Sequence, residues 1–256
     1  LFYDWRDFEK PPLLNGAPNY TKKSFKKRDS GFRELRSRLE KINTRGWEKS
    51  HLIDFKIVWA EMNGYDFNRR VLRPWERDPA FYQTIWTYES DVPAHEGPTN
   101  HAVLELWTYS FPLTEKEEER LTKELQVIPP LLKQARKNLT GNAKDLWVAG
   151  VVNLERQGQV LRELQKKIID KTPELDSALK KAEKETSRFV VWLKKEAKNK
   201  TGPSGVEKEN YTWYQQNVHL LPFTWEEEVA LLERELSRAW SSLALEEQKN
   251  RGLPPM

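Results

Sequence analysis

Apolar residues recur at helical spacing along most of the chain from residue 31 onward. The first such segment carries them three or four positions apart, at Phe32, Leu35, Leu39 and Ile42. The next, which begins after Gly46, has the same spacing at Leu52, Phe55, Trp59 and Met62. Side chains at this spacing share one face of an α-helix, so both segments are predicted to be amphipathic helices. The same pattern predicts further helices over about residues 115–139, 142–170, 173–199, 207–219 and 224–249.

Helix boundary signals support this division. Thr114 with Glu117, and Thr224 with Glu227, each form a capping-box pattern, in which the two side chains satisfy free backbone N–H groups at a helix start. Pro74 is predicted to end the second helix, because the residue before a proline disfavours the helical conformation.

Two stretches lack this periodicity. Residues 1–28 contain two proline breaks and are predicted to form an extended N-terminal arm before a helical domain over residues 29–256. Residues 74–112 contain four prolines and are predicted to be irregular, with short helices near 80–86 and 101–109. Because the alternation typical of strands is nearly absent, the sequence predicts an all-α fold, an irregular multi-helix bundle of about 8–10 helices.

The composition is that of a folded domain with a charged surface. The 256 residues include 11 Trp, 10 Phe and 8 Tyr, more large apolar groups than a disordered chain carries. Lys and Arg total 43 against 39 Asp and Glu, and only residues 22–49 are locally basic. The aromatic residues there, Phe25, Phe32 and Trp47, are predicted to anchor a core rather than to stack on bases. No nucleic-acid partner is therefore expected.

Cysteine content and hydropathy exclude further classes of protein. The chain has no cysteine, which excludes thiolate catalysis, cysteine-ligated zinc and disulfides. No apolar run approaches the ~18–20 residues of a membrane-spanning helix, so no membrane span is expected.

One short string has the composition of a metal motif without its geometry. His95-Glu96 is followed by a second histidine only at position 101. A zinc site of the His-Glu-x-x-His type needs both imidazoles one turn apart on one helix. Gly97 and Pro98 break the helix between the two histidines. An exposed loop is predicted here, and no metal-binding or catalytic residue is assigned in this chain.

The segment from Tyr211 to Trp225 holds the candidate site residues Tyr214, Asn217 and His219. It combines apolar side chains with Asn and His just before a capped helix. Buried polar groups need hydrogen-bond partners, so one hypothesis is a structural network. The other hypothesis places these side chains in a substrate cleft, where Tyr and His can donate to a carbonyl or an oxyanion.

Three strings of the sequence resemble one known family. They are residues 55–82, with Ala60-Glu61-Met62-Asn63-Gly64 and the run from Val71 to Tyr82, residues 128–139, and residues 210–225. Together they resemble the bacterial domain-of-unknown-function family 885, over most of the chain from about residue 30. The third string, Tyr-Thr-Trp-Tyr followed by Asn-Val-His-Leu-Leu-Pro-Phe-Thr-Trp-Glu-Glu, is the most specific.

The resemblance implies a function that the chain's own residues do not. Members of the family are larger helical proteins, commonly exported, that look related to zinc metallopeptidases of the gluzincin type. Many carry a His-Glu-x-x-x-His-like motif toward the C-terminal half, and that motif has no counterpart here. The implied protein is a periplasmic or secreted zinc-dependent hydrolase, of which residues 29–256 form the helical N-terminal part.

In that protein zinc would belong to the C-terminal half, which would be the partner of this chain. This chain would supply scaffold and one wall of a cleft for a peptide substrate. The alternative is a non-catalytic helical binding or scaffold protein.

Overall fold

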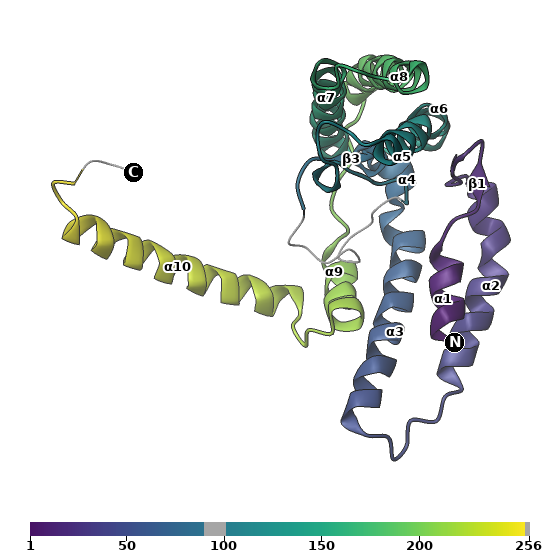
Figure 1. The fold of residues 1–256 in the computed structure, drawn as a ribbon. Helices are drawn as coiled ribbons and strands as arrows, with labels where there is room; N and C mark the ends of the chain where they lie inside the picture. Colours follow the sequence, from purple (N-terminus) through teal and green to yellow (C-terminus); the bar gives the residue numbers. More distant parts are fainter. Residues whose placement is uncertain (90–100, 254–256) are drawn as a thin grey trace.

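The computed structural model describes residues 1–89 and 101–253, and almost all of its regular structure is helical (Figure 1). Over these residues the α-helices are α1 (Phe2–Glu9), α2 (Lys22–Glu40), α3 (Lys49–Phe67), α4 (Pro74–Arg77), α5 (Glu115–Gln126), α6 (Ile128–Asn138), α7 (Lys144–Lys167), α8 (Pro173–Ala197), α9 (Lys208–Tyr214) and α10 (Trp225–Lys249). The π-helices η1 (Asn68–Leu72) and η4 (Gln215–His219) extend α3 and α9, and the 3-10 helices are η2 (Pro79–Tyr82) and η3 (Leu106–Thr108). The prediction of an all-α, multi-helix fold is confirmed.

Side-chain caps fix the helix starts that the sequence predicted. Thr114 and Thr224 accept hydrogen bonds from the backbone N–H of Glu117 and Glu227, and these two glutamates accept in return from the backbone N–H of the threonines. α5 and α10 therefore begin at the predicted positions.

The upper part of the molecule in Figure 1 is a bundle of α5, α6, α7 and α8, in which α8 packs against the other three. Its core contains Trp147 of α7 and Phe189 of α8, both without exposed surface. Gln157 of α7 is almost completely buried and accepts from the backbone N–H of Thr84 at 2.8 Å. This hydrogen bond attaches the irregular stretch after η2 to the bundle.

Gly150 lets η2 lie close against α7. A Cβ atom at this position would lie 2.6 Å from the Cβ of Pro79 and 3.0 Å from the backbone nitrogen of Ala80. Because a packed segment would have to move, we expect Gly150→Ala to lower the free energy of unfolding by about 1–3 kcal/mol in denaturant melts. Gly158→Ala is the matched control in the same helix, since its nearest neighbour would be 3.5 Å away. The control is expected to be neutral or stabilising, and equal losses in both variants would contradict the packing argument.

The prediction of an extended arm over residues 1–28 is wrong. Residues 2–9 form α1, which lies beside α2 (Figure 1), and Trp5 in this helix has no exposed surface. The strands β1 (Leu13–Leu14) and β2 (Ala17–Pro18) pair as an antiparallel hairpin, and α2 already begins at residue 22. A helix of eight residues shows no sustained period, and it is stabilised by packing against partners distant in sequence.

Residues 74–112 are irregular in the part that the structure describes. The strand β3 (Ile85–Trp86) pairs in parallel with β4 (Leu104–Glu105). The short helices expected near 80–86 and 101–109 are reduced to the single 3-10 turns η2 and η3. Pairing of Ile85–Trp86 with Leu104–Glu105 takes these residues out of the two segments, and only single turns form beside the strands.

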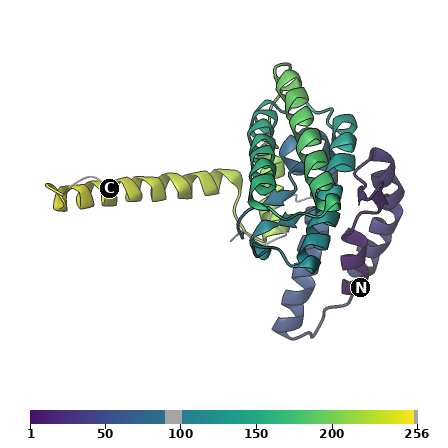
Figure 2. The ribbon, with the colours of Figure 1, turned by 45° about the horizontal axis from the view of Figure 1, so that its top comes forward.

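α10 projects away from the rest of the molecule, as both ribbon views show (Figures 1 and 2). None of its 25 residues is buried. Across residues 1–89 and 101–253, no helix combines the length and the hydropathy of a membrane span.

Candidate functional site

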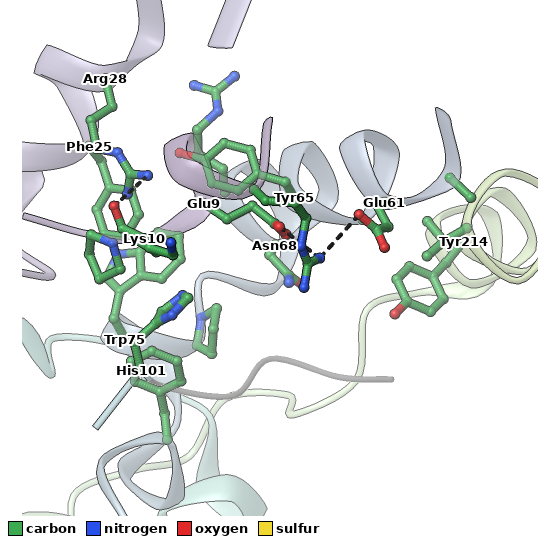
Figure 3. A pocket seen from close by; sticks show the side chains of 18 of the residues that line it. Glu9, Lys10, Phe25, Arg28, Glu61, Tyr65, Asn68, Trp75, His101 and Tyr214 are labelled. Atoms are coloured by element: carbon green, nitrogen blue, oxygen red, sulfur yellow. Dashed lines mark hydrogen bonds and ion pairs between the residues drawn. The ribbon is translucent and has the colours of Figure 1, made fainter. Parts of the chain in front are cut away.

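A groove of about 970 Å³ opens between the N-terminal helices and the segment formed by α9 and η4 (Figure 3). Its walls come from α1, α2, α3, η1, α4, η2, α9 and η4, together with His101 from the irregular stretch. Polar and aromatic side chains from segments far apart in sequence therefore meet in one concave surface.

Residues of two π-helices line the groove, Asn68 of η1 and Val218 of η4. Arg73 follows η1 (φ 44°) and Leu220 follows η4 (φ 58°). Both residues adopt a left-handed conformation, which is costly for a side chain with a Cβ atom. π-helical turns and strained backbone occur most often at functional sites, so the junction of α3 and η4 is a candidate site.

The three predicted site residues take different places. Tyr214 and His219 line the groove, with ring centroids 4.8 Å apart. Asn217 has a structural role, because its side-chain amide donates to the carbonyl of Trp213 at 2.9 Å. The carbonyl of Asn217 accepts from Nδ2 of Asn63, also at 2.9 Å, and so fastens η4 to α3.

His219 belongs to a chain of hydrogen bonds as well as to the groove. Its Nδ1 lies 3.0 Å from Oε1 of the buried Gln215. Gln215 donates to the Tyr211 hydroxyl at 2.8 Å, and that hydroxyl donates to Glu228 at 2.8 Å. Since an amide oxygen can only accept, the contact places a proton on Nδ1 and leaves Nε2 of the neutral ring as an acceptor.

Desolvation and the hydrogen bond to Glu228 raise the pKa of the Tyr211 hydroxyl, which keeps its proton in this chain of hydrogen bonds. The network hypothesis and the cleft hypothesis are therefore compatible for His219. The side chain takes part in a network and lines the groove.

Charged side chains from α1 and α3 line another part of the groove. The guanidinium of Arg6 lies 2.9 Å from the carboxylate of Glu9 and 3.4 Å from that of Glu61 (Figure 3). The indole N–H of Trp5 also donates to Glu61, at 3.0 Å. This cluster attaches α1 to α3 and puts two carboxyl groups on the groove wall.

Burial raises the pKa of Glu9 to about 7, with Arg6 opposing the rise and Glu61 adding to it. The folded state therefore binds the proton of Glu9 more tightly than the unfolded state does, whose ordinary value is 4.5. The corresponding stability is fully present below the unfolded pKa and is lost as the pH rises through about 7.

We expect Glu9→Gln to match the natural protein near pH 4 and to be about 1–2 kcal/mol more stable than it at pH 8. Thermal melts at the two pH values measure this difference. Asp7→Asn removes an exposed carboxylate from the same helix and is expected to show no such gain at pH 8. A loss of stability in the Glu9→Gln variant at pH 8 would mean that the ion pair with Arg6 outweighs burial.

Arg28 adds positive charge to the groove. Its guanidinium donates to the carbonyl oxygens of Phe8 and Lys10 at the end of α1, and lies 4.6 Å from the centroid of the Phe8 ring. Desolvation and the charges of Arg28 and Arg6 lower the pKa of His101. These effects favour the neutral form of the His101 imidazole.

The described residues do not fit a zinc ion. A protein zinc site uses three or four nitrogen, oxygen or sulfur ligands that converge on one point. No group of three or more His, Asp or Glu side chains that could hold a metal occurs within 1–89 and 101–253. His95 lies outside the described residues.

Sequence reasoning did not identify Arg6, Glu9, Arg28 and Glu61 as groove residues. Arg6 and Glu9 fall in the segment predicted to be an arm, so no face was assigned to them. A local signal for a helix was present in this segment. Trp5 and Phe8 lie three positions apart, as do Arg6 and Glu9, which is the spacing of one turn of an amphipathic helix.

Comparison of the chain with models of protein families, with curated protein sequences and with solved structures finds no match. A functional proposal therefore starts from the geometry of the groove and from the expectation drawn from the three sequence strings.

Proposed function

We propose that this chain is the helical N-terminal half of a zinc-dependent, peptidase-like hydrolase, and that the groove is one wall of its substrate cleft. The metal site belongs to a C-terminal part of the same protein, which is the partner of this half. The proposed substrate class is peptide, and the same resemblance supports an exported protein.

The contacts among the three resembling strings support the proposal. Asn63 in the first string donates to the carbonyl of Asn217 in the third at 2.9 Å. Asn138 in the second string donates to the hydroxyl of Tyr82 in the first at 3.1 Å. The first and third strings also line the groove. Segments that share one resemblance and meet at one concave surface are typical of a site built from distant parts of a chain.

In such a cleft this half would hold the peptide. The Tyr214 hydroxyl can donate to a substrate carbonyl or oxyanion, and His219 can accept at Nε2 from a peptide N–H. Arg28 supplies positive charge for a substrate carboxylate. The role proposed for these residues is to bind the peptide, and none of them is given a step that involves zinc.

Metal and activity measurements on the intact natural protein test the proposal. We expect about one zinc ion per molecule, and hydrolysis of unmodified peptides that a chelator abolishes. The 256-residue chain alone is expected to bind no stoichiometric zinc and to hydrolyse no peptide.

An intact protein without zinc and without hydrolysis would favour the alternative, a non-catalytic helical binding or scaffold protein. One equivalent of zinc held by the 256-residue chain and lost on His95→Ala would show that the metal site lies in this half after all.

A further inference from the structure

α10 is a helix without a partner on most of its length. The hydrogen bonds that attach it to the body lie in its first turn, among the residues that the structure describes. The backbone N–H of Trp225 donates to Oγ1 of Thr212 at 3.0 Å, and Glu228 accepts from the Tyr211 hydroxyl. The remaining turns extend away from the molecule (Figures 1 and 2). At 1.5 Å per residue, the 25 residues span about 37 Å.

One face of α10 is apolar and exposed. Its apolar side chains step by three and four positions, at Val229, Leu232, Leu236, Ala239 and Leu243, with Trp240 beside them. We call these six residues the α10 stripe. Leu232, Leu236 and Trp240 are 61%, 58% and 62% exposed.

The spacing of the α10 stripe is that of a helix-pairing seam. Burying these large side chains against a partner would stabilise a complex and oppose the cost of association. Contiguous apolar surface of this kind marks an interaction site. In the part of the chain that the structure describes, nothing covers it.

Acidic side chains border the α10 stripe on both sides. At about 100° per residue, Glu226 and Glu233 lie along one edge, and Glu228, Glu235 and Glu246 lie along the other. The basic residues of the helix, Arg234, Arg238 and Lys249, lie on the opposite face. The surface offered to a partner is therefore apolar in the middle and negative at both edges.

This charge pattern decides among possible occupants. In an antiparallel pair of α10 helices centred on Leu236, Glu235 would face Glu235 of the second copy, and Glu228 would face Glu246. Like charges in these positions disfavour self-pairing. An anionic membrane is disfavoured for the same reason, because membrane-surface helices carry Lys and Arg beside their apolar face.

We propose that the α10 stripe binds an amphipathic helix whose apolar seam is flanked by lysine or arginine side chains. Glu235 pairs with Arg238 at 2.8 Å and Glu246 with Lys249 at 2.7 Å, but exposed pairs of this kind are weak enough to be exchanged for pairs with a partner. The most basic helix of the described chain, α2, is not the occupant, because its own apolar side chains are already buried. The inference concerns helix docking alone and does not depend on zinc chemistry.

Two synthetic peptides of equal length test the proposal. Both carry leucine and isoleucine at the seam positions of a heptad repeat, one with lysine and the other with glutamate at the flanking positions. Fluorescence anisotropy of each labelled peptide is measured against the 256-residue chain. We expect the lysine peptide to bind at least about tenfold more tightly than the glutamate peptide, with an affinity that falls as salt rises.

Two substitutions of exposed leucines in α10 provide the site control. Leu236→Glu, in the α10 stripe, is expected to abolish binding of the lysine peptide. Leu245→Glu is expected to leave binding unchanged, since Leu245 is 60% exposed on the opposite face. Circular dichroism checks that both variants keep their helix content.

Three outcomes would overturn the proposal. Equal binding of the two peptides would contradict the proposed preference for a basic partner. If neither peptide binds, the α10 stripe is not a docking site for such a helix. Sedimentation that shows a dimer of the chain, dissociated by Leu236→Glu, would make a second copy the occupant.

Discussion

Truncating Trp5 to alanine is expected to lower the free energy of unfolding by about 3–5 kcal/mol, the range for large aromatic side chains removed from a core. Trp5 has no exposed surface and stacks on Phe8 with ring centroids 5.9 Å apart. It meets the Tyr65 ring edge to face at 5.6 Å, and its indole N–H donates to Glu61. Its removal leaves a cavity between α1 and α3 and takes a donor from a carboxylate on the groove wall. Urea melts measure the loss.

Tyr3→Ala is the control for Trp5→Ala, because Tyr3 lies in the same helix and is 82% exposed. We expect it to change stability by no more than about 0.5 kcal/mol. If both variants cost little, residues 1–28 would behave as the extended arm that the sequence pattern predicted. A large loss for Trp5 alone would make α1 part of the folded core.

The long helices could be predicted because their determinants are local. α7 and α8 show their period over more than six turns, and Thr172 with Pro173 marks the start of α8. How deeply a face is buried is a different matter, since it depends on what packs against it. Met62 is fully buried, whereas Phe55 and Trp59 on the same predicted stripe are only half-buried. All three pack in a second, smaller core that also contains Trp5 and Phe32.

The candidate site was predictable only in part. Tyr214 and His219 stand out in the sequence because polar side chains sit among apolar ones just before a helix cap. The rest of the groove could not be predicted, because it depends on contacts between distant residues. Arg6 and Glu61, for example, are 55 positions apart in the sequence. A contact of that kind depends on the packing of α1 against α3, and no local pattern encodes it. The π-helical turns were not predicted either, because each is a five-residue extension of α3 or α9 and is too short to show a period of its own.

His219→Ala in the intact natural protein is the prediction that separates a cleft role from a structural one. If the groove is a wall of the cleft, we expect kcat/KM for peptide hydrolysis to fall about 100-fold, or roughly 2.7 kcal/mol, with little change in melting temperature. The physical reason is that the imidazole ring of His219 is held in one orientation toward the groove. Gln215 holds Nδ1 at 3.0 Å, so Nε2 is presented in one orientation, as an acceptor when the ring is neutral and as a donor when it is protonated.

His51→Ala is the matched control for His219→Ala, because His51 is exposed in α3 and does not line the groove. It is expected to leave both turnover and melting temperature unchanged. A large fall in the melting temperature of His219→Ala, with turnover per folded molecule intact, would reduce His219 to a member of the network with Gln215 and Tyr211. The two results are distinct because the network acts on folding, whereas a cleft residue acts on the barrier of the reaction.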